Sequence, residues 1–222
     1  MALPLTELEK RIGYCFRNAE YLRRAVTHSS YSNEQGEKHH HLLCNERLEF
    51  LGDSVLGFVT AEYLFTEFKN RPEGEMTKLR AAVVCEKSLF KFAEQIDLGK
   101  YIYLGRGEEN TGGRNRASML ADAFEAVIAA IYLDSDLEVA RNFVMSFILK
   151  ELKHTDDEVF KDYKTALQEI IQRNPEEYVT YVLKGESGPD HDKVFEVEVH
   201  LNSNVIGCGK GKNKKQAEQM AA

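Results

Sequence analysis

Three acidic residues interrupt an apolar stretch between Glu46 and Phe58, and their spacing constrains what this chain can fold into. Apolar residues recur there at intervals of three and four, which predicts a largely buried helix: Leu48, Leu51, Val55, Leu56 and Val59. Glu46, Glu49 and Asp53 stand three and four positions apart, so their carboxylates follow one face of that helix. Such a row beside a core is unfavourable unless a cation neutralises it, although a solvated acidic face is the simpler alternative.

A second segment, 117–133, is apolar on nearly every side and predicts a buried helix too short and too polar at its ends to span a membrane. It contains Asp122 and Glu125 on one face and no lysine or arginine to pair with them. If the two helices pack together, four carboxylates converge in an all-oxygen pocket. Such ligands suit Mg²⁺ or Mn²⁺ and not zinc.

Four blocks of sequence, in order, carry a family resemblance: Ala25–Tyr31 (AVTHSSY), Asn45–Ser54 (NERLEFLGDS), Glu73–Arg80 (EGEMTKLR) and Leu120–Ala126 (LADAFEA). Together they resemble bacterial ribonuclease III, the double-stranded-RNA endonuclease. The resemblance implies an all-α, dimerising catalytic domain over residues 1–155. It also implies Mg²⁺-dependent hydrolysis, with Mn²⁺ as a substitute, leaving 5′-phosphate and 3′-hydroxyl ends. Processing of rRNA and mRNA precursors and RNA decay in the cytoplasm are the corresponding roles.

The same resemblance assigns roles to individual residues. Four carboxylates match the metal centre: Glu49, Asp53, Asp122 and Glu125. Among them, Asp53 and Glu125 match the most critical catalytic acids. Glu46 and Glu73 match acids near the cleft, although solvated acids explain them equally well. Phe50 matches a residue of a two-fold dimer interface, with core packing inside the protomer as the alternative.

After residue 161 the pattern changes, and residues 162–222 predict a small α+β domain with the order α-β-β-β-α. Residues 194–201 alternate between apolar and polar side chains, as a half-buried strand does. With Gly188–His191 and Lys214–Glu218, this order resembles a double-stranded-RNA-binding domain. The matching RNA contacts are Gln168, His191, Lys212, Lys214 and Lys215. Because eight basic and ten acidic residues follow position 161, a solvated lysine run is the alternative.

The remaining segments predict helices near 5–12, 77–85, 87–96 and 137–152, with Asn18 capping another helix. Gly99 is expected to end the helix 87–96, and Ser118 is expected to cap the helix 117–133. Residues 32–44, with solvated histidines at 39–41, and the glycine-rich segment 105–114 are interpreted as loops. Residues 154–158 are interpreted as the domain boundary. Because family members normally continue the last helix, we expect a truncated one at Ala222.

Composition narrows the classes further. The hydrophobic fraction of 43% supports a packed core, and nothing at the N-terminus resembles a signal peptide. Four scattered cysteines without a Cys-x-x-Cys pair indicate reduced thiols and a cytoplasmic protein. The net charge of −7 by itself argues against a nucleic-acid partner. It is an average over the whole chain, however, and a local basic patch can coexist with an acidic metal site.

Two other functions fit the sequence less well. A noncatalytic RNA-binding module would not need all four carboxylates of the predicted metal centre. A helical metal phosphohydrolase for small substrates typically uses His-Asp ligand pairs, which the sequence lacks.

Overall fold

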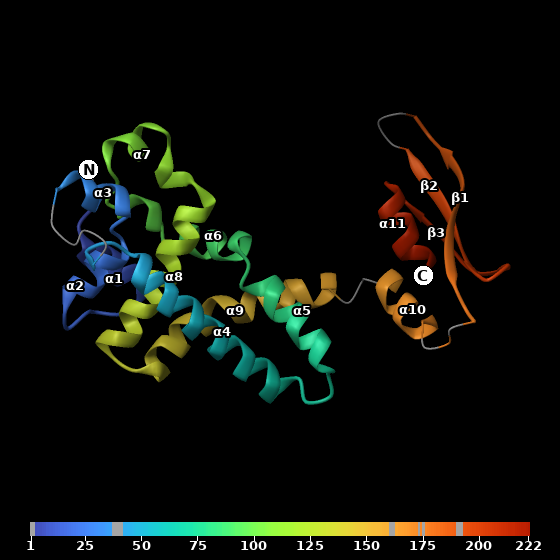
Figure 1. Cartoon of the computed structure of the whole chain (residues 1–222), viewed down its shortest axis with the longest axis horizontal. Coiled ribbons are helices and arrows are strands. Elements are labelled where there is room, and N and C mark those ends of the chain that lie inside the picture. Colours follow the sequence, from blue (N-terminus) through green and yellow to red (C-terminus); the bar gives the residue numbers. More distant parts are fainter. Residues whose placement is uncertain (1–2, 37–41, 160–162, 173, 175, 190–192) are drawn as a thin grey trace. The chain divides into compact units, whose positions relative to one another are not determined.

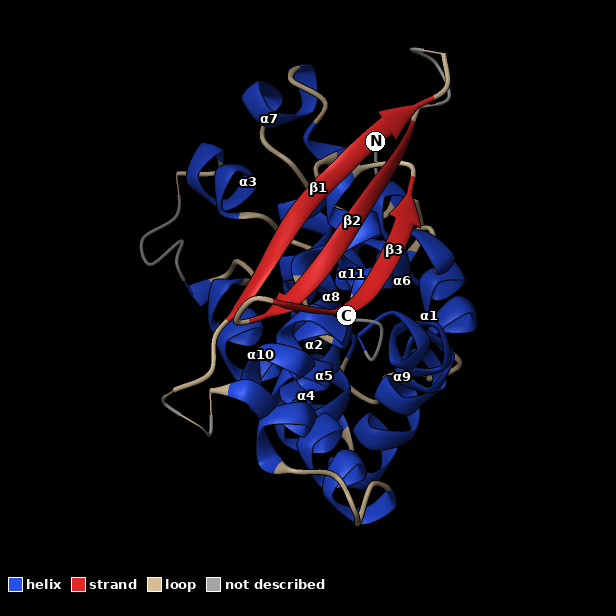
Figure 2. Cartoon of the chain, turned by 90° about the vertical axis from the view of Figure 1, so that its right-hand side faces the viewer, coloured by secondary structure: helices blue, strands red, loops and turns tan. Residues whose placement is uncertain are grey.

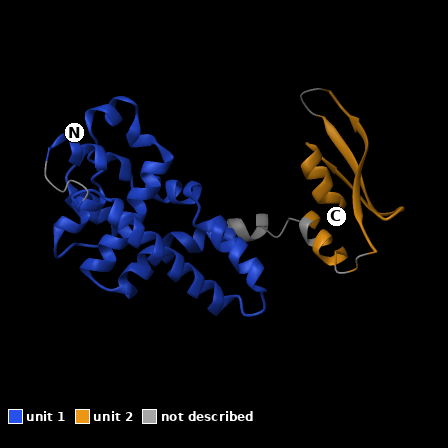
Figure 3. Cartoon of the chain, in the orientation of Figure 1, with its two compact units in different colours: residues 1–155 blue, residues 156–222 orange. Residues whose placement is uncertain are grey.

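The computed structural model describes residues 3–36, 42–159, 163–172, 174, 176–189 and 193–222. The chain divides into two compact units, Met1–Thr155 and Asp156–Ala222 (Figure 3). None of the described helices is both long enough and apolar enough to cross a lipid bilayer.

The first unit is helical, as the sequence predicts (Figure 1). Its α-helices are α1 Leu5–Ile12, α2 Ala19–Ala25, α3 Ser29–Glu34, α4 Glu46–Glu67, α5 Glu73–Val83, α6 Glu86–Gln95, α7 Arg106–Asn110, α8 Ala117–Asp134 and α9 Leu137–Val159. Two short 3₁₀ turns, η2 Leu98–Lys100 and η3 Gly113–Asn115, lie between α6 and α8. In the described part of this unit, extended pairing is limited to one bridge between Thr27 and Tyr103.

Helix α8 lies at the centre of this unit and is buried along most of its length. α4, α6 and α2 pack against it. Four phenylalanine rings from three helices meet beside it, with centroids 5.2 to 5.7 Å apart: Phe92, Phe124, Phe143 and Phe147. These tilted and edge-on contacts, together with the buried area, stabilise the packing around the helix that carries Asp122 and Glu125.

The C-terminus of α8 is held by one buried carboxylate. Asp134 accepts hydrogen bonds from the Tyr14 hydroxyl at 2.8 Å and from the backbone N–H groups of Arg17 and Asn18 at 2.7 and 2.8 Å. Asn18 in turn caps α2, because its side chain accepts from the N–H of Glu20. This cap was predicted, but the contact from Asp134 was not.

Helices α4 and α8 lie very close to each other at Gly52. A Cβ atom placed on Gly52 would lie 1.9 Å from the backbone oxygen of Glu125. Only a residue without a side chain fits at that distance. The close approach brings the acidic face of α4 beside the acidic face of α8.

Two loop predictions are wrong, because contacts between distant parts of the chain order these residues. The segment 105–114 is not a flexible connector, because it contains α7 and leads into η3. The Arg114 guanidinium holds it by donating to the carbonyl oxygens of Gly99 and Ile102 and to the Glu109 carboxylate. Residues 32–34 of the loop predicted over 32–44 belong to α3, Ser29–Glu34, and the Glu34 carboxylate accepts a 2.7 Å hydrogen bond from the N–H of Arg106.

Helix ends also differ from the predictions. Asp97, with φ of 55°, takes the left-handed position after α6, and Gly99 lies inside η2. A Cβ at Gly99 would lie 2.5 Å from the carbonyl oxygen of Arg114, so close packing explains that glycine. Arg116 occupies the N-cap of α8 and Ser118 lies inside the helix. Residues 154–158 belong to α9, which continues to Val159.

The second unit has the predicted α-β-β-β-α order: α10 Tyr163–Ile171, β1 Val179–Ser187, β2 Val194–Leu201, β3 Asn204–Gly211 and α11 Lys214–Ala221. The strands form one antiparallel sheet in the order β1-β2-β3 (Figure 2). Val197 and Val199 of β2 are buried with Ala217 and Ala221 of α11. The alternation predicted for residues 194–201 is therefore confirmed.

Strand β3 lies close to α11 because three alternate residues lack side chains. Cβ atoms on Gly207, Gly209 and Gly211 would lie 2.3 to 2.5 Å from the backbone of α11. Since alternate strand residues face the same side, the three glycines form one flat contact surface for the helix.

Gly52→Ala tests the helix contact that positions α8. We expect a loss of about 1–3 kcal/mol in the free energy of unfolding, because the new methyl group meets backbone and not a flexible side chain. This loss should outweigh the roughly 1 kcal/mol that alanine gains over glycine inside a helix. Thermal and urea unfolding measure it.

Gly74→Ala is the control, because Gly74 lies in helix α5 and a Cβ there would meet nothing within 4 Å. This variant should be neutral or up to about 1 kcal/mol more stable than the parent. Equal stability changes in the two variants would contradict the close approach.

Candidate metal centre

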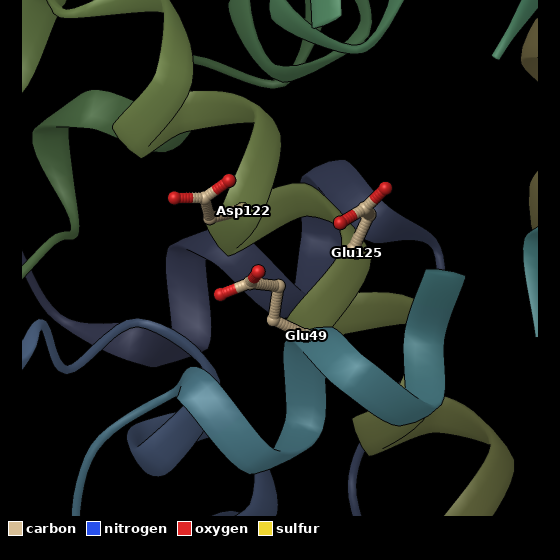
Figure 4. A group of neighbouring side chains, drawn as sticks. All are labelled: Glu49, Asp122 and Glu125. Atoms are coloured by element: carbon tan, nitrogen blue, oxygen red, sulfur yellow. The ribbon is translucent and has the colours of Figure 1, made fainter. Parts of the chain in front are cut away.

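Three carboxylates from two helices meet beside the Gly52 contact. Glu49 of α4 and Asp122 and Glu125 of α8 each offer an oxygen, and these oxygens lie within 4.8 Å of one another. Figure 4 shows Glu49 directed toward α8, where Asp122 and Glu125 project from adjacent turns. All three side chains are half-buried. The structure thus brings together three of the four carboxylates predicted for the metal centre.

The electrostatics of this group favour a cation. Burial, followed by the charges of Asp53, Glu49 and Asp122, raises the pKa of Glu125 to about 8. Burial, followed by the charge of Asp122, also raises the pKa of Glu49. Burial likewise raises the pKa of Asp122. A divalent cation would reverse these effects, because it stabilises the ionised form of each ligand.

The donor set fits a hard cation. It consists of carboxylate oxygens alone, which suit Mg²⁺ or Mn²⁺, and no cysteine or histidine belongs to the group. The backbones of α4 and α8 are in contact at Gly52, which has no side chain. This contact between two helices fixes the positions of the oxygens without a loop. This geometry can hold a cation and leave part of its coordination shell open to water and to a phosphate.

Asp53 is exposed and does not belong to the three-residue group. It nevertheless lies near enough for its charge to raise the pKa of Glu125, where it is the second-largest effect after burial. Glu46 is exposed in the first turn of α4 and acts on Glu49 in the same way. Glu73 begins α5, accepts a hydrogen bond from the Thr77 hydroxyl at 2.7 Å, and lines a different cavity.

Two neighbours of Asp122 were not predicted as part of the site. Glu86, in the first turn of α6, raises the pKa of Asp122, and His28 opposes that effect. His28 caps α3, where its Nδ1 accepts from the N–H of Ser30. Glu86 carries no motif that the sequence could reveal, because its relation to Asp122 depends on how α6 packs against α8.

Phe50 has no packing partner that buries it inside the protomer, since its side chain is 78% exposed. Phe58 and Phe65 on the same helix are exposed by 52% and 74%. The core-packing alternative for Phe50 is therefore excluded within the protomer. Exposed aromatic side chains of this number on one helix are typical of an interaction surface.

In the second unit, the predicted RNA contacts are exposed where they can be described. Gln168 lies on α10, and Lys214 and Lys215 begin α11 after the Asn213 cap. Lys212 is also exposed, and its backbone N–H donates to the Gln216 side chain. Lys210 is different, because it pairs with Glu196 at 3.4 Å. His191 and the histidines at 39–41 lie outside the described residues.

Comparisons with known proteins give matches for both units of the chain. The sequence model of a family described as Ribonuclease-III-like matches residues 18–152, and that of the double-stranded RNA binding motif matches residues 163–222. The chain is 47% identical over 218 residues to Ribonuclease 3 of Natranaerobius thermophilus, covering 98% of this chain and 93% of that protein. It is 48% identical over 221 residues to Ribonuclease 3 of Clostridium tetani, covering 99% and 92%.

A solved structure gives the same result for the first unit. The nuclease domain of ribonuclease III from Campylobacter jejuni, in a study of flexibility in a region involved in dimer formation, matches with a TM-score of 0.61 and 42% sequence identity. The match covers 66% of this chain and 97% of that one.

The raised pKa of Glu125 predicts how pH changes the stability of the metal-free protein. The folded state holds this proton more tightly than the unfolded state, so stability falls as pH rises from the ordinary value of 4.5 toward about 8. Glu125→Gln removes the titration. In EDTA the variant should therefore melt above the parent at about pH 9 and close to it at about pH 5.

Thermal unfolding across this pH range, with Glu67→Gln as the control, measures the difference. Glu67 is an exposed acid at the end of α4 and should show no such trend. Addition of Mg²⁺ should stabilise the parent more than Glu125→Gln. A difference in melting temperature that does not vary with pH would contradict the raised pKa.

Proposed function

Because the chain belongs to the ribonuclease III family and is an endoribonuclease with a double-stranded-RNA-binding domain, we propose that it cleaves duplex RNA in a Mg²⁺-dependent hydrolysis. The products would carry 5′-phosphate and 3′-hydroxyl ends, and Mn²⁺ should substitute because it accepts the same oxygen ligands. The observation that supports this most directly is the group formed by Glu49, Asp122 and Glu125. The proposed substrates are precursors of rRNA and mRNA and RNAs due for decay in the cytoplasm.

When bound, the cation would lower the pKa of a water ligand and withdraw charge from the scissile phosphate. We assign Glu49 and Asp122 to holding it, because each offers an oxygen within 4.8 Å of the other oxygens of the group. We assign Glu125 to both binding and catalysis, since it is the acid whose pKa the site raises most clearly. Its carboxylate must lose a proton before it can act as a ligand.

We assign Asp53 to the catalytic pair with Glu125. Asp53 follows Glu49 by one turn of α4 and is exposed, so water and substrate can reach it while its charge acts on Glu125. In this position it would orient a water molecule on the solvent side of the centre. Glu46, one turn before Glu49 on α4, would add to the acidic surface beside the centre, and neither Glu46 nor Glu73 is proposed as a direct ligand.

Glu125→Gln should abolish cleavage while preserving the fold and duplex binding. An amide has the size of the carboxylate but is a poor ligand for magnesium, and metal assistance is worth several kcal/mol. We expect the single-turnover rate on a long duplex to fall roughly 10³-fold or more. Gel analysis of cleavage with and without Mg²⁺ measures it.

Glu67→Gln serves again as the control and should cleave normally. Mobility-shift binding in EDTA should be the same for both variants and the parent. A near-normal rate for Glu125→Gln in Mg²⁺ would contradict the assignment of Glu125 to the metal centre.

We also propose that the enzyme is a two-fold homodimer through the exposed aromatic surface of α4. A duplex needs one cut in each strand, and two identical centres provide them. The three aromatic side chains Phe50, Phe58 and Phe65 lie within about 80° of one another around the helix, since a helix turns by about 100° per residue. A two-fold interface is self-complementary, so each of them would occur twice in the contact.

Phe50→Ala should weaken dimerisation and leave the protomer intact. Removing a buried phenylalanine typically costs about 3–5 kcal/mol, and the interface contains it twice. Because the side chain is 78% exposed in the protomer, helicity measured by circular dichroism should not change. Sedimentation velocity over a dilution series would show that the variant dimer dissociates at a higher protein concentration than the parent dimer.

Tyr178→Ala is a suitable control, because Tyr178 is an aromatic residue of similar exposure, 58%, in the second unit. It should dissociate at the same concentration as the parent. A Phe50→Ala dimer that is as stable as the parent at low concentration would place the interface elsewhere.

For the second unit, we propose that Lys212, Lys214 and Lys215 contact phosphates, and that Gln168 and His191 contact the minor groove. A-form RNA is recognised in this way through shape and not through sequence. Lys214 and Lys215 are exposed at the N-terminus of α11 and form no ion pair with any described residue. Cations oppose the helix dipole there, and a phosphate bound between them would offset this cost.

A further inference from the structure

A cavity of about 240 Å³ lies between α2 and α3, apart from the acidic centre. Its lining consists of Glu20, Arg23, Arg24, Thr27, Tyr31, Ser32, Gln35 and Leu43. This volume is far above the ~10–15 Å³ of such space that one water molecule needs, so the cavity accommodates a small anion with several waters. Nothing in the proposed cleavage chemistry uses this cavity.

Two arginines supply its charge. Nε of Arg24 is buried and has no hydrogen-bond partner among the described residues. Neither Arg23 nor Arg24 forms an ion pair with any residue that the structure describes. A guanidinium N–H group that is buried without an acceptor destabilises the fold. The Nε–H group of Arg24 therefore lacks a hydrogen-bond acceptor among the described residues.

The nearby acidic side chains that the structure describes do not form ion pairs with Arg23 or Arg24. Glu20 precedes Arg23 and Arg24 by three and four residues, the spacing at which helical ion pairs form, yet no ion pair joins them in the described part of the chain. Glu34 on α3 accepts the N–H of Arg106 instead. The cavity lining thus carries two positive charges against one negative charge.

Neutral donors complete the lining. The Tyr31 ring is held against Tyr103, with centroids 5.5 Å apart, and the side chains of Tyr31 and Gln35 line the cavity. The hydroxyl groups of Thr27 and Ser32 already donate to backbone carbonyl oxygens, of Arg23 and Ser29 respectively. Tyr31 and Gln35 are therefore the neutral side chains that remain able to donate to a ligand.

We propose that this cavity binds a phosphate group through Arg24, with Arg23 and Tyr31 as supporting contacts. The planar guanidinium fork matches the oxygens of a phosphate, and hydrogen bonds between charged groups are the strong ones. The phosphate could belong to the RNA backbone, which would add a contact of the nuclease unit to duplex RNA. It could also be free, as inorganic phosphate or a nucleotide product.

The test uses the full-length protein in EDTA, so neither cleavage nor the metal centre contributes. One arm measures thermal stability and calorimetric binding with inorganic phosphate, against acetate at the same ionic strength. The other arm measures binding of a plain RNA duplex as a function of salt. The variants are Arg24→Gln and Tyr31→Phe, with Lys10→Gln on the exposed surface of α1 as the control for loss of one positive charge.

If the phosphate is free, inorganic phosphate should stabilise the parent and acetate should not. Arg24→Gln should then weaken phosphate binding roughly tenfold or more, and Tyr31→Phe about two- to tenfold. If the phosphate belongs to RNA, Arg24→Gln should weaken duplex binding and reduce the log–log salt slope by about one. Loss in both arms would show that either source occupies the cavity.

The proposal is overturned if Arg24→Gln and Tyr31→Phe behave like Lys10→Gln in both arms, or if acetate stabilises the parent as well as phosphate does. Tyr31→Phe keeps the test decisive should Arg24→Gln fail to fold. Because no measurement depends on cleavage, failure here leaves the metal-centre assignment untouched, and failure of that assignment leaves this one untouched.

Discussion

The contact between α4 and α8 at Gly52 is the constraint on which the rest of the nuclease unit depends. The missing side chain lets the backbone of Glu125 lie where a Cβ atom would be. Glu49 is three residues before Gly52 on α4, and Asp122 is three residues before Glu125 on α8. Because residues three apart share a helix face, one close contact places all three carboxylates at one point. The site therefore forms without the ordering of a loop.

This arrangement carries an energetic penalty that the surrounding core must offset. Burial first, and neighbouring like charges second, raise the pKa values of Glu49, Asp122 and Glu125. The phenylalanine cluster and the contact of Asp134 with the N-terminus of α2 hold α8 from its other side and its far end. The helix can therefore present acids on one side without moving away from α4. A rigid site of this kind is pre-organised for a cation, because repulsion in its absence becomes attraction in its presence.

Features set by local sequence were predictable, and features set by tertiary packing were not. The strand 194–201 and the helix 5–12 follow from periodicity and match the structure at both ends. The segment 105–114 was misinterpreted because its order comes from Arg114 and Glu34, which no local pattern reveals. Asp97 takes the left-handed conformation expected of Gly99, since Gly99 is required for close packing. Glu86 was missed for the same reason, since only the packing of α6 against α8 relates it to Asp122.

The distribution of charge explains how an acidic chain can serve a polyanionic substrate. On the outer face of the second unit, Lys184 pairs with Glu198 and Lys210 pairs with Glu196, so opposite charges on neighbouring strands cancel. Lys214 and Lys215 are outside these pairs and begin α11 with their charges uncompensated by any described residue. In the nuclease unit, acids gather where a cation would neutralise them, and Arg23 and Arg24 gather at a separate cavity. The net charge of −7 therefore describes neither surface, and RNA would meet the local charge of each.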